Sequence, residues 1–194
     1  MLEVLLGGLL GLLLLGLAVH LLFMAFRTLA RDSARTELQQ SATLALDSLA
    51  ADLRQSAPES ISLGGGWEGL SQGTRAIGVD RIASVSADVA RLYEPCLIVY
   101  SWDPQEKLLT RQEVRTPLSL FADPRRPVRM TPAELADVDA PRRILARGVV
   151  DFQAGDSSGL IGQPFPLRLS LEREVPYGRK VERFTLIRDV FLTN

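Results

Sequence analysis

The sequence predicts an α+β protein in which one long N-terminal helix packs on an antiparallel, β-rich head. Three observations indicate this fold class: a nearly unbroken apolar run from Leu2 to Phe26, a one-sided helical pattern after it, and strand–turn–strand patterns in the remainder. The 194 residues suffice for one ordinary domain, and the net charge of −1 gives no support for a nucleic-acid partner. We expect three regions: a transmembrane half of the helix (1–26), an amphipathic half (27–57) and a globular head (58–194).

The apolar run is long enough to span a bilayer, which takes about 20 apolar residues in a helix. Its one acidic residue is Glu3. A carboxylate near the centre of such a segment costs about 2.5–3.5 kcal/mol, so a residue of this kind usually has a partner. Gly7 and Gly11 have the GxxxG spacing that lets two helices approach closely. The alternative is that these glycines are ordinary residues of a membrane helix.

The segment after Phe26 predicts that the same helix continues into the head. Apolar residues recur there at steps of three and four, which places them on one face of a helix. Four of them are expected to pack on the head, namely Leu38, Ala42, Leu49 and Leu53. No glycine or proline occurs between Leu17 and Ala57, and Pro58 ends the helix. We therefore expect one helix from about residue 2 to about residue 56, roughly 80 Å long at 1.5 Å per residue.

The first part of the head predicts short strands and one clear hairpin. Ser60–Leu63 indicates a short extended piece, and Arg75–Ala90 one or two short strands. Leu97–Trp102 is rich in β-branched and aromatic residues and is separated from Leu108–Val114 by a turn-like segment, Asp103–Lys107.

The second part predicts a short helix and a second hairpin. Thr131-Pro132-Ala133-Glu134 has capping-box spacing, so we expect a helix from there to about Val138. Ile144–Phe152 indicates a strand, or a strand after a turn. Alternating apolar residues over Leu167–Leu171 predict a strand with one buried face, paired with Val181–Leu192.

Reactive residues are few, and we expect no enzymatic activity, cofactor or metal. His20 is the single histidine and lies in the apolar run, so no second histidine completes a metal site or a Ser–His pair. Cys96 is the single cysteine and cannot form an internal disulfide. Trp67 and Trp102 are either partner anchors or core residues, and the core role is favoured. The segment Asp151–Asp156 does not have the spacing of a calcium loop.

The N-terminal segment Met1-Leu2-Glu3-Val4-Leu5-Leu6 resembles the mature start of type IV pilins and type II secretion pseudopilins. Glu3 stands at the position of the glutamate in that family's signature. Within the head, Tyr100–Arg111, Leu145–Phe152 and Arg188–Asn194 resemble the minor pseudopilin J and minor pilin W families. Met1 falls where the third mature residue of the family stands. We therefore expect that the basic leader and the first two mature residues are missing from this sequence.

The resemblance implies a structural subunit at the tip or in the initiation complex of a filament. It implies that Glu3 meets the methylated N-terminal amine of a neighbouring subunit, and that other pilins or pseudopilins contact the helix and the head. It also implies membrane lipid around the helix before assembly, a prepilin peptidase acting on the leader, and an inner-membrane location. The head would be periplasmic, and the assembled filament periplasmic or extracellular. A secretion pseudopilus and an adhesive or DNA-uptake pilus both fit these features.

Two other functions are compatible with a helix and a head. A single-pass, membrane-anchored binding or adaptor domain explains both parts but leaves Glu3 without a role. A membrane-tethered hydrolase is the weakest alternative, because no set of reactive groups supports it. Orientation also has two readings: Arg27, Arg31 and Arg35 follow the apolar run, which by the positive-inside rule places the head in the cytoplasm, whereas the resemblance places it outside.

Overall fold

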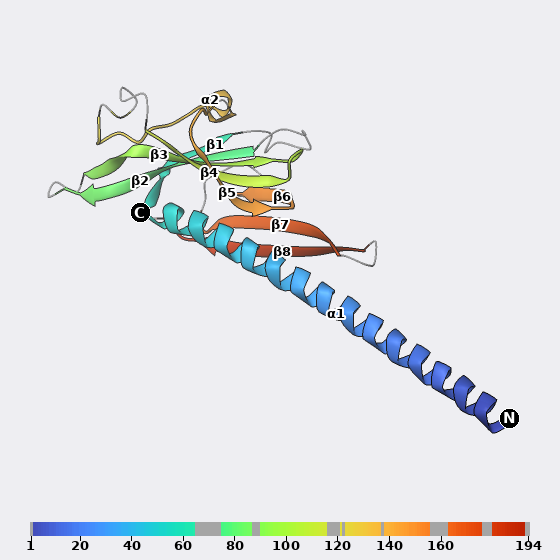
Figure 1. Cartoon of the computed structure of the whole chain (residues 1–194). Coiled ribbons are helices and arrows are strands. Elements are labelled where there is room, and N and C mark those ends of the chain that lie inside the picture. Colours follow the sequence, from blue (N-terminus) through green and yellow to red (C-terminus); the bar gives the residue numbers. More distant parts are fainter. Residues whose placement is uncertain are drawn as a thin grey trace.

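A computed structural model shows one long helix that carries a β-rich head at its C-terminal end, an α+β fold (Figure 1). The structure describes residues 2–64, 75–86, 90–115, 121, 123–136, 138–155, 163–175 and 180–192. The predicted fold class is confirmed. Figure 1 shows the N-terminal half of the helix extending away from the head.

Helix α1 is continuous from Leu2 to Arg54, a length of 53 residues or roughly 80 Å at 1.5 Å per residue. An acidic residue in the first turn (Glu3) and a basic one in the last turn (Arg54) complement the helix dipole. The helix ends two residues earlier than expected, because Ser56 already begins the first strand and its Oγ donates a hydrogen bond to the Leu53 carbonyl at 2.7 Å. Pro58 therefore lies inside a strand and does not mark the helix end.

The described residues of the head form two antiparallel sheets. The larger has the order β1-β2-β3-β4-β5 and the smaller the order β6-β7-β8. The strands of the larger sheet are β1 (Ser56–Gly64), β2 (Arg75–Val85), β3 (Arg91–Asp103), β4 (Leu108–Val114) and β5 (Arg142–Arg147). Those of the smaller sheet are β6 (Val149–Ala154), β7 (Phe165–Val175) and β8 (Lys180–Val190).

Helix α1 packs on both sheets and forms the main core with them. The four helix residues expected to pack on the head, Leu38, Ala42, Leu49 and Leu53, are all buried in this core. They meet apolar residues of both sheets, including Ile98, Tyr100 and Leu109 from the larger and Leu167, Leu169 and Leu171 from the smaller. The contact starts further along than the sequence pattern suggests: Phe26 is exposed, and Ala34 is the first buried residue of the stripe.

The opposite face of the larger sheet is covered by a short helix, α2 (Pro132–Ala136), and by the segment before it. Its core includes Leu97, Val99, Val128 and Leu135. The predicted capping box is present: Glu134 accepts a hydrogen bond from the Thr131 amide at 2.7 Å, and the Glu134 amide donates to the Thr131 hydroxyl at 3.4 Å. The helix stops at Ala136, earlier than the expected Val138, which is not helical.

The chain passes from the larger sheet to the smaller one at a glycine, Gly148. The segment Ile144–Phe152, predicted as a strand or a strand after a turn, is divided into β5 and β6 at Gly148, whose φ is +73°. A Cβ added there would lie 2.3 Å from the carbonyl oxygen of Glu172, so only glycine fits. The Gly148 carbonyl in turn accepts a hydrogen bond from the Glu172 amide at 2.7 Å, which fixes the junction to β7.

The two predicted hairpins are present. In the first, Leu97 pairs with Val114 and Asp103 with Leu108. In the second, Phe165 pairs with Val190 and Val175 with Lys180, and its turn lies outside the described residues. Residues 75–85 form a single long strand, β2, where one or two short strands were expected. Its irregular register, with shifts near Ile82, explains why the alternation in the sequence is interrupted.

Candidate functional site

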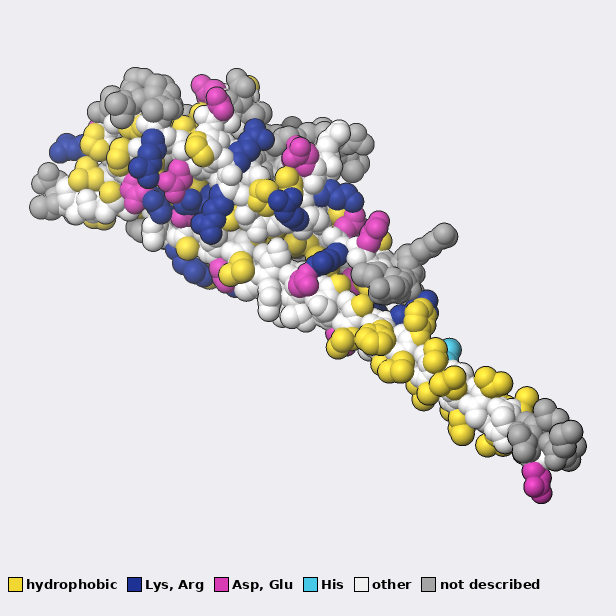
Figure 2. Space-filling view, in the orientation of Figure 1, with side chains coloured by type: hydrophobic (Ala, Val, Ile, Leu, Met, Phe, Trp, Pro, Cys, Tyr) yellow, Lys and Arg dark blue, Asp and Glu magenta, His cyan; other side chains and the backbone are white. Residues whose placement is uncertain are grey.

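The candidate site is the half of α1 that extends beyond the head. Every side chain from Leu6 to Leu29 is exposed, and large apolar residues such as Leu12 and Leu13 are more than two-thirds exposed, at 69% and 68%. Figure 2 shows these apolar side chains covering the free part of the helix. This helix is long and apolar enough to cross a membrane. So large an apolar surface requires lipid or other proteins around it.

A shallow groove with a carboxylate at one end lies on one face of this half. Glu3, Gly7 and Gly11 follow one another at steps of four, which places them on one side of the helix. They line the groove with Leu6, Leu10 and Leu14. Apart from the neighbouring backbone of the helix itself, no described atom lies within 4 Å of a Cβ built on Gly7 or Gly11, so nothing in the described chain requires glycine there. The space is available to a second helix.

Three ion pairs join the second half of α1 to the strands of the smaller sheet. Arg31 pairs with Glu182. Glu37 pairs with Arg173, and Asp47 pairs with Arg188. Each helix charge meets the opposite charge on β7 or β8, so the pairs fix the rotation of the helix on the sheet. Arg31 is the contact nearest to the exposed half among these three, and it marks the edge of the head along α1.

A buried charge network fixes the last turn of α1 to the larger sheet. The Asp52 carboxylate accepts hydrogen bonds from Arg111 Nε at 3.1 Å, from Arg81 Nη1 at 3.3 Å and from the Tyr100 hydroxyl at 2.5 Å. Arg81 also donates to Glu94 at 2.9 Å. Burial and the neighbouring Asp52 both raise the pKa of Tyr100, so the hydroxyl keeps its proton and donates a hydrogen bond to the carboxylate. The direction of the exposed half is therefore set by the head.

A second buried carboxylate lies on the other face of the larger sheet. Asp80 is fully buried, and its Oδ2 accepts a hydrogen bond from the Val128 amide at 2.8 Å. Its Oδ1 has no hydrogen-bond partner among the described residues. Burial raises the pKa of Asp80 to about 7, although the Val128 hydrogen bond acts in the other direction. Glu94 adds to the increase.

The remaining candidates from the sequence do not come together into a reactive site. Cys96 is buried and burial raises its pKa, which disfavours the reactive thiolate. His20 is exposed on α1. Trp102 is buried, and its Nε1 donates a hydrogen bond to the Val149 carbonyl at 3.1 Å, so it is a core residue.

Other positions named from the sequence fall partly outside the described residues. Trp67 and Asp156 lie outside the described residues. Asp151 lies within them and pairs with Arg75 at 3.6 Å. Within the described ranges, no group of three or more His, Cys, Asp or Glu residues is placed to hold a metal ion.

Sequence reasoning missed Asp52 and Asp80. Asp52 adjoins the apolar stripe at Leu53, and Asp80 interrupts an apolar strand pattern. An acidic residue within an expected buried segment was the available signal for both.

Comparisons of the chain with protein-family models, with curated proteins and with solved structures gave no match. The structure itself defines a class: an α+β protein whose single long helix is packed on a β-rich head over its second half and is exposed and apolar over its first.

Proposed function

We propose that the chain is a minor pilin or pseudopilin that assembles through its N-terminal helix into a type IV pilus-like or type II secretion filament. The observation that carries this proposal is the unbroken α1, in which one helix is both an exposed apolar rod and part of the core of the head. A filament built from such subunits has a bundle of helices at its centre and the heads outside. The proposed place of this subunit is the tip or the initiation complex.

The groove at the start of the rod supports helix–helix packing over simple anchoring. A membrane anchor needs only apolar length, and the segment from Leu6 to Phe26 already provides it. The carboxylate of Glu3 adds a cost in lipid that anchoring does not repay. A positively charged group of a neighbouring subunit in the groove would offset that cost, and Gly7 and Gly11 would let the neighbouring backbone come close.

The attachment of the helix to the head supports the same function. Because the Asp52 network and the core fix the second half of α1, the head and the rod move as one unit. A subunit of this kind places its head at a defined position once its rod is in a bundle. The proposal puts the chain in the inner membrane before assembly, with the head in the periplasm and other pilins or pseudopilins as its partners.

The test uses substitutions on two faces of the rod. Gly7→Ala/Gly11→Ala fills the groove, and Glu3→Ala removes the carboxylate. Gly16→Ala is the matched control, because position 16 is nine residues from Gly7 and thus on the opposite side of the helix. Each Gly→Ala change favours the helix by about 1 kcal/mol per site and meets no atom of the chain. Loss of assembly would therefore come from contacts between subunits.

The variants are expressed in cells that carry the source filament genes, and incorporation into the filament is measured by subunit cross-linking. We expect Glu3→Ala and Gly7→Ala/Gly11→Ala to lose incorporation, and Gly16→Ala to keep it. Circular dichroism of the full chain in detergent checks that all variants fold. If the wild type is membrane-bound but is not incorporated into the filament, the helix is only an anchor and the adaptor function is favoured. If the groove variants are incorporated like the wild type, the groove is not the contact between subunits.

A further inference from the structure

Strand β5 forms one edge of the larger sheet, and no strand of the described residues pairs with its outer side. Its residues pair with β4 on the inner side, from Arg147 with Leu108 to Arg142 with Gln112. Among the described residues, no backbone or side-chain hydrogen bond reaches the outer side of this strand. Unpaired backbone groups at such an edge can accept a further strand.

The charged residues of this edge all have the same sign. Arg142, Arg143 and Arg147 are all exposed, and none of them forms an ion pair with a described residue. By contrast, the arginines of neighbouring β4 and of the segment after it are neutralised, since Arg111 and Arg115 both bind Glu113. The edge therefore carries three uncompensated positive charges on a strand of six residues.

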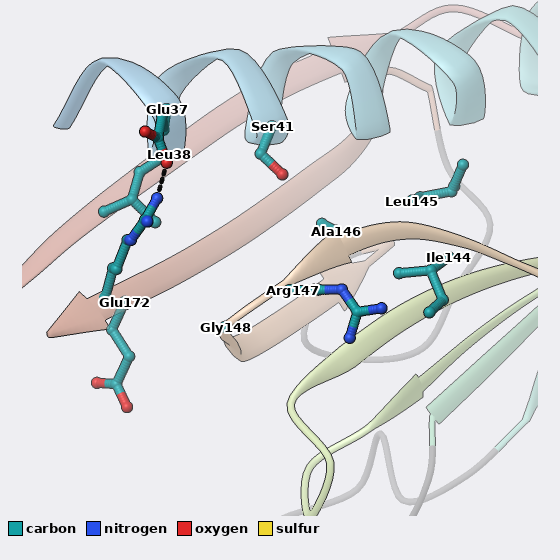
Figure 3. A pocket seen from close by; sticks show the side chains of 10 residues that line it. Glu37, Leu38, Ser41, Ile144, Leu145, Ala146, Arg147, Gly148 and Glu172 are labelled. Carbon is teal, nitrogen blue, oxygen red and sulfur yellow. Dashed lines mark ion pairs between the residues drawn. The ribbon is translucent and has the colours of Figure 1, made fainter. Parts of the chain in front are cut away.

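A cleft of about 730 Å³ lies beside this edge, between β5, β7 and α1. Figure 3 shows Glu37 and Ser41 of α1 on one side of it and Ile144 and Arg147 of β5 on the other. Its acidic side chains are already paired: Glu37 binds Arg173, and Glu172 binds Lys107 and Arg183. The cleft thus has one free charged group among its described lining residues, Arg147.

We propose that the outer edge of β5 binds an extended acidic segment of a partner protein, which adds to the larger sheet as a further strand. The backbone of that segment would pair with β5, and its carboxylates would meet the three arginines. Ile144, which is 41% exposed, offers an apolar contact at the middle of the strand. This inference concerns the head alone and does not depend on the filament assignment.

Charge complementarity selects this occupant. Charged residues on an edge strand also serve to prevent edge-to-edge association. The edge strand β8 of the smaller sheet has charges of both signs, with Glu182, Arg183, Arg188 and Asp189. On β5 every charged residue is an arginine, so this edge repels basic segments and attracts acidic ones. The cleft gives the added strand a place between the helix and the sheet.

The test measures binding of synthetic peptides to the full chain in detergent by fluorescence anisotropy. The probe is a peptide of about eight residues rich in Val and Thr, a strand-forming composition, with Glu on both of its faces, because the adjacent Arg142 and Arg143 point to opposite faces of the sheet. One comparison peptide has Gln in place of Glu. A second keeps Glu but is N-methylated at alternate residues, so that one edge of it cannot donate hydrogen bonds. The chain variants are Arg142→Gln/Arg143→Gln/Arg147→Gln and, as a control that removes two exposed charges away from β5, Arg125→Gln/Arg126→Gln.

We expect the acidic peptide to bind the wild type and the Arg125→Gln/Arg126→Gln control equally, and the β5 variant at least about tenfold more weakly. The Gln peptide and the N-methylated peptide should each lose at least about tenfold in affinity. No binding of the acidic peptide, equal binding to the β5 variant, or an unaffected N-methylated peptide would overturn the proposal. Dimerisation of the chain through β5, seen by sedimentation and lost in the β5 variant, would also overturn it by making a second copy the occupant.

Discussion

Replacing Asp80 by asparagine tests whether a buried carboxyl makes the stability of the head depend on pH. The side chain is fully buried and has one hydrogen bond, from the Val128 amide at 2.8 Å. Burial raises its pKa to about 7 from the ordinary value of 3.8. The folded state therefore binds this proton more tightly than the unfolded state does.

The sign and size of the pH effect on stability follow from this difference in proton binding. The stabilisation by the bound proton is complete below about pH 3.8, and it is lost as the pH rises to about 7, where the folded protein begins to release the proton. Over the two pH units from about 5 to about 7, each unit changes the free energy of unfolding by about 1.4 kcal/mol. We expect the wild type to lose up to about 3 kcal/mol between about pH 5 and about pH 8 through this group.

The asparagine variant keeps an oxygen to accept the Val128 hydrogen bond but cannot ionise. Relative to the wild type, Asp80→Asn should therefore gain up to about 3 kcal/mol of stability between about pH 5 and about pH 8. Urea titrations of the full chain in detergent, followed by the fluorescence of tryptophans that include the buried Trp102, measure both. A wild type with equal stability at both pH values would refute the reasoning. A variant with the same pH dependence as the wild type would refute the assignment to Asp80.

Two further predictions concern the attachment of the helix and the junction of the sheets. Leu49→Ala, which removes a fully buried side chain of α1, should lower the free energy of unfolding by about 2–5 kcal/mol. Leu44→Ala, at a position that is 70% exposed, should change the free energy of unfolding by no more than about 0.5 kcal/mol in the same urea titration. Equal effects of the two substitutions would contradict the packing described. Gly148→Ala should lower it by at least about 1–3 kcal/mol, because the methyl group meets the Glu172 carbonyl and φ is positive. A variant as stable as the wild type in thermal denaturation would disprove that constraint.

The features that could be predicted from the sequence depend on residues close together in the chain. The absence of glycine and proline from Leu17 to Ala57 predicts the continuous helix, and the steps between Leu38 and Leu53 predict which face packs on the head. The capping box at Thr131 and the two hairpins are local patterns in the same sense. The groove with Glu3, Gly7 and Gly11 was predictable as one helix face, since a step of four returns to the same side.

The features that could not be predicted depend on residues far apart. Asp52 meets Arg111, which is 59 residues away, and no spacing in the sequence indicates that contact. The roles of Gly148 and Glu172 become visible only when the junction between β5 and β6 lies against β7. The same holds for the cleft at β5, which needs three elements to form. The boundary between the exposed and packed parts of α1 is also set by the head, which places the first buried residue of the stripe at Ala34.

The attachment of the rod rests on its buried contacts more than on its ion pairs. Exposed pairs such as Arg31–Glu182 and Glu37–Arg173 typically contribute about 0–1 kcal/mol each, because solvent screens them. Burying a leucine contributes about 1.5–3 kcal/mol, and four leucines of α1 lie in the core: Leu38, Leu46, Leu49 and Leu53. The last turns of the helix therefore hold the head, and the exposed pairs mainly fix its rotation. A head attached in this way follows its rod, which is what a subunit assembling through the rod requires.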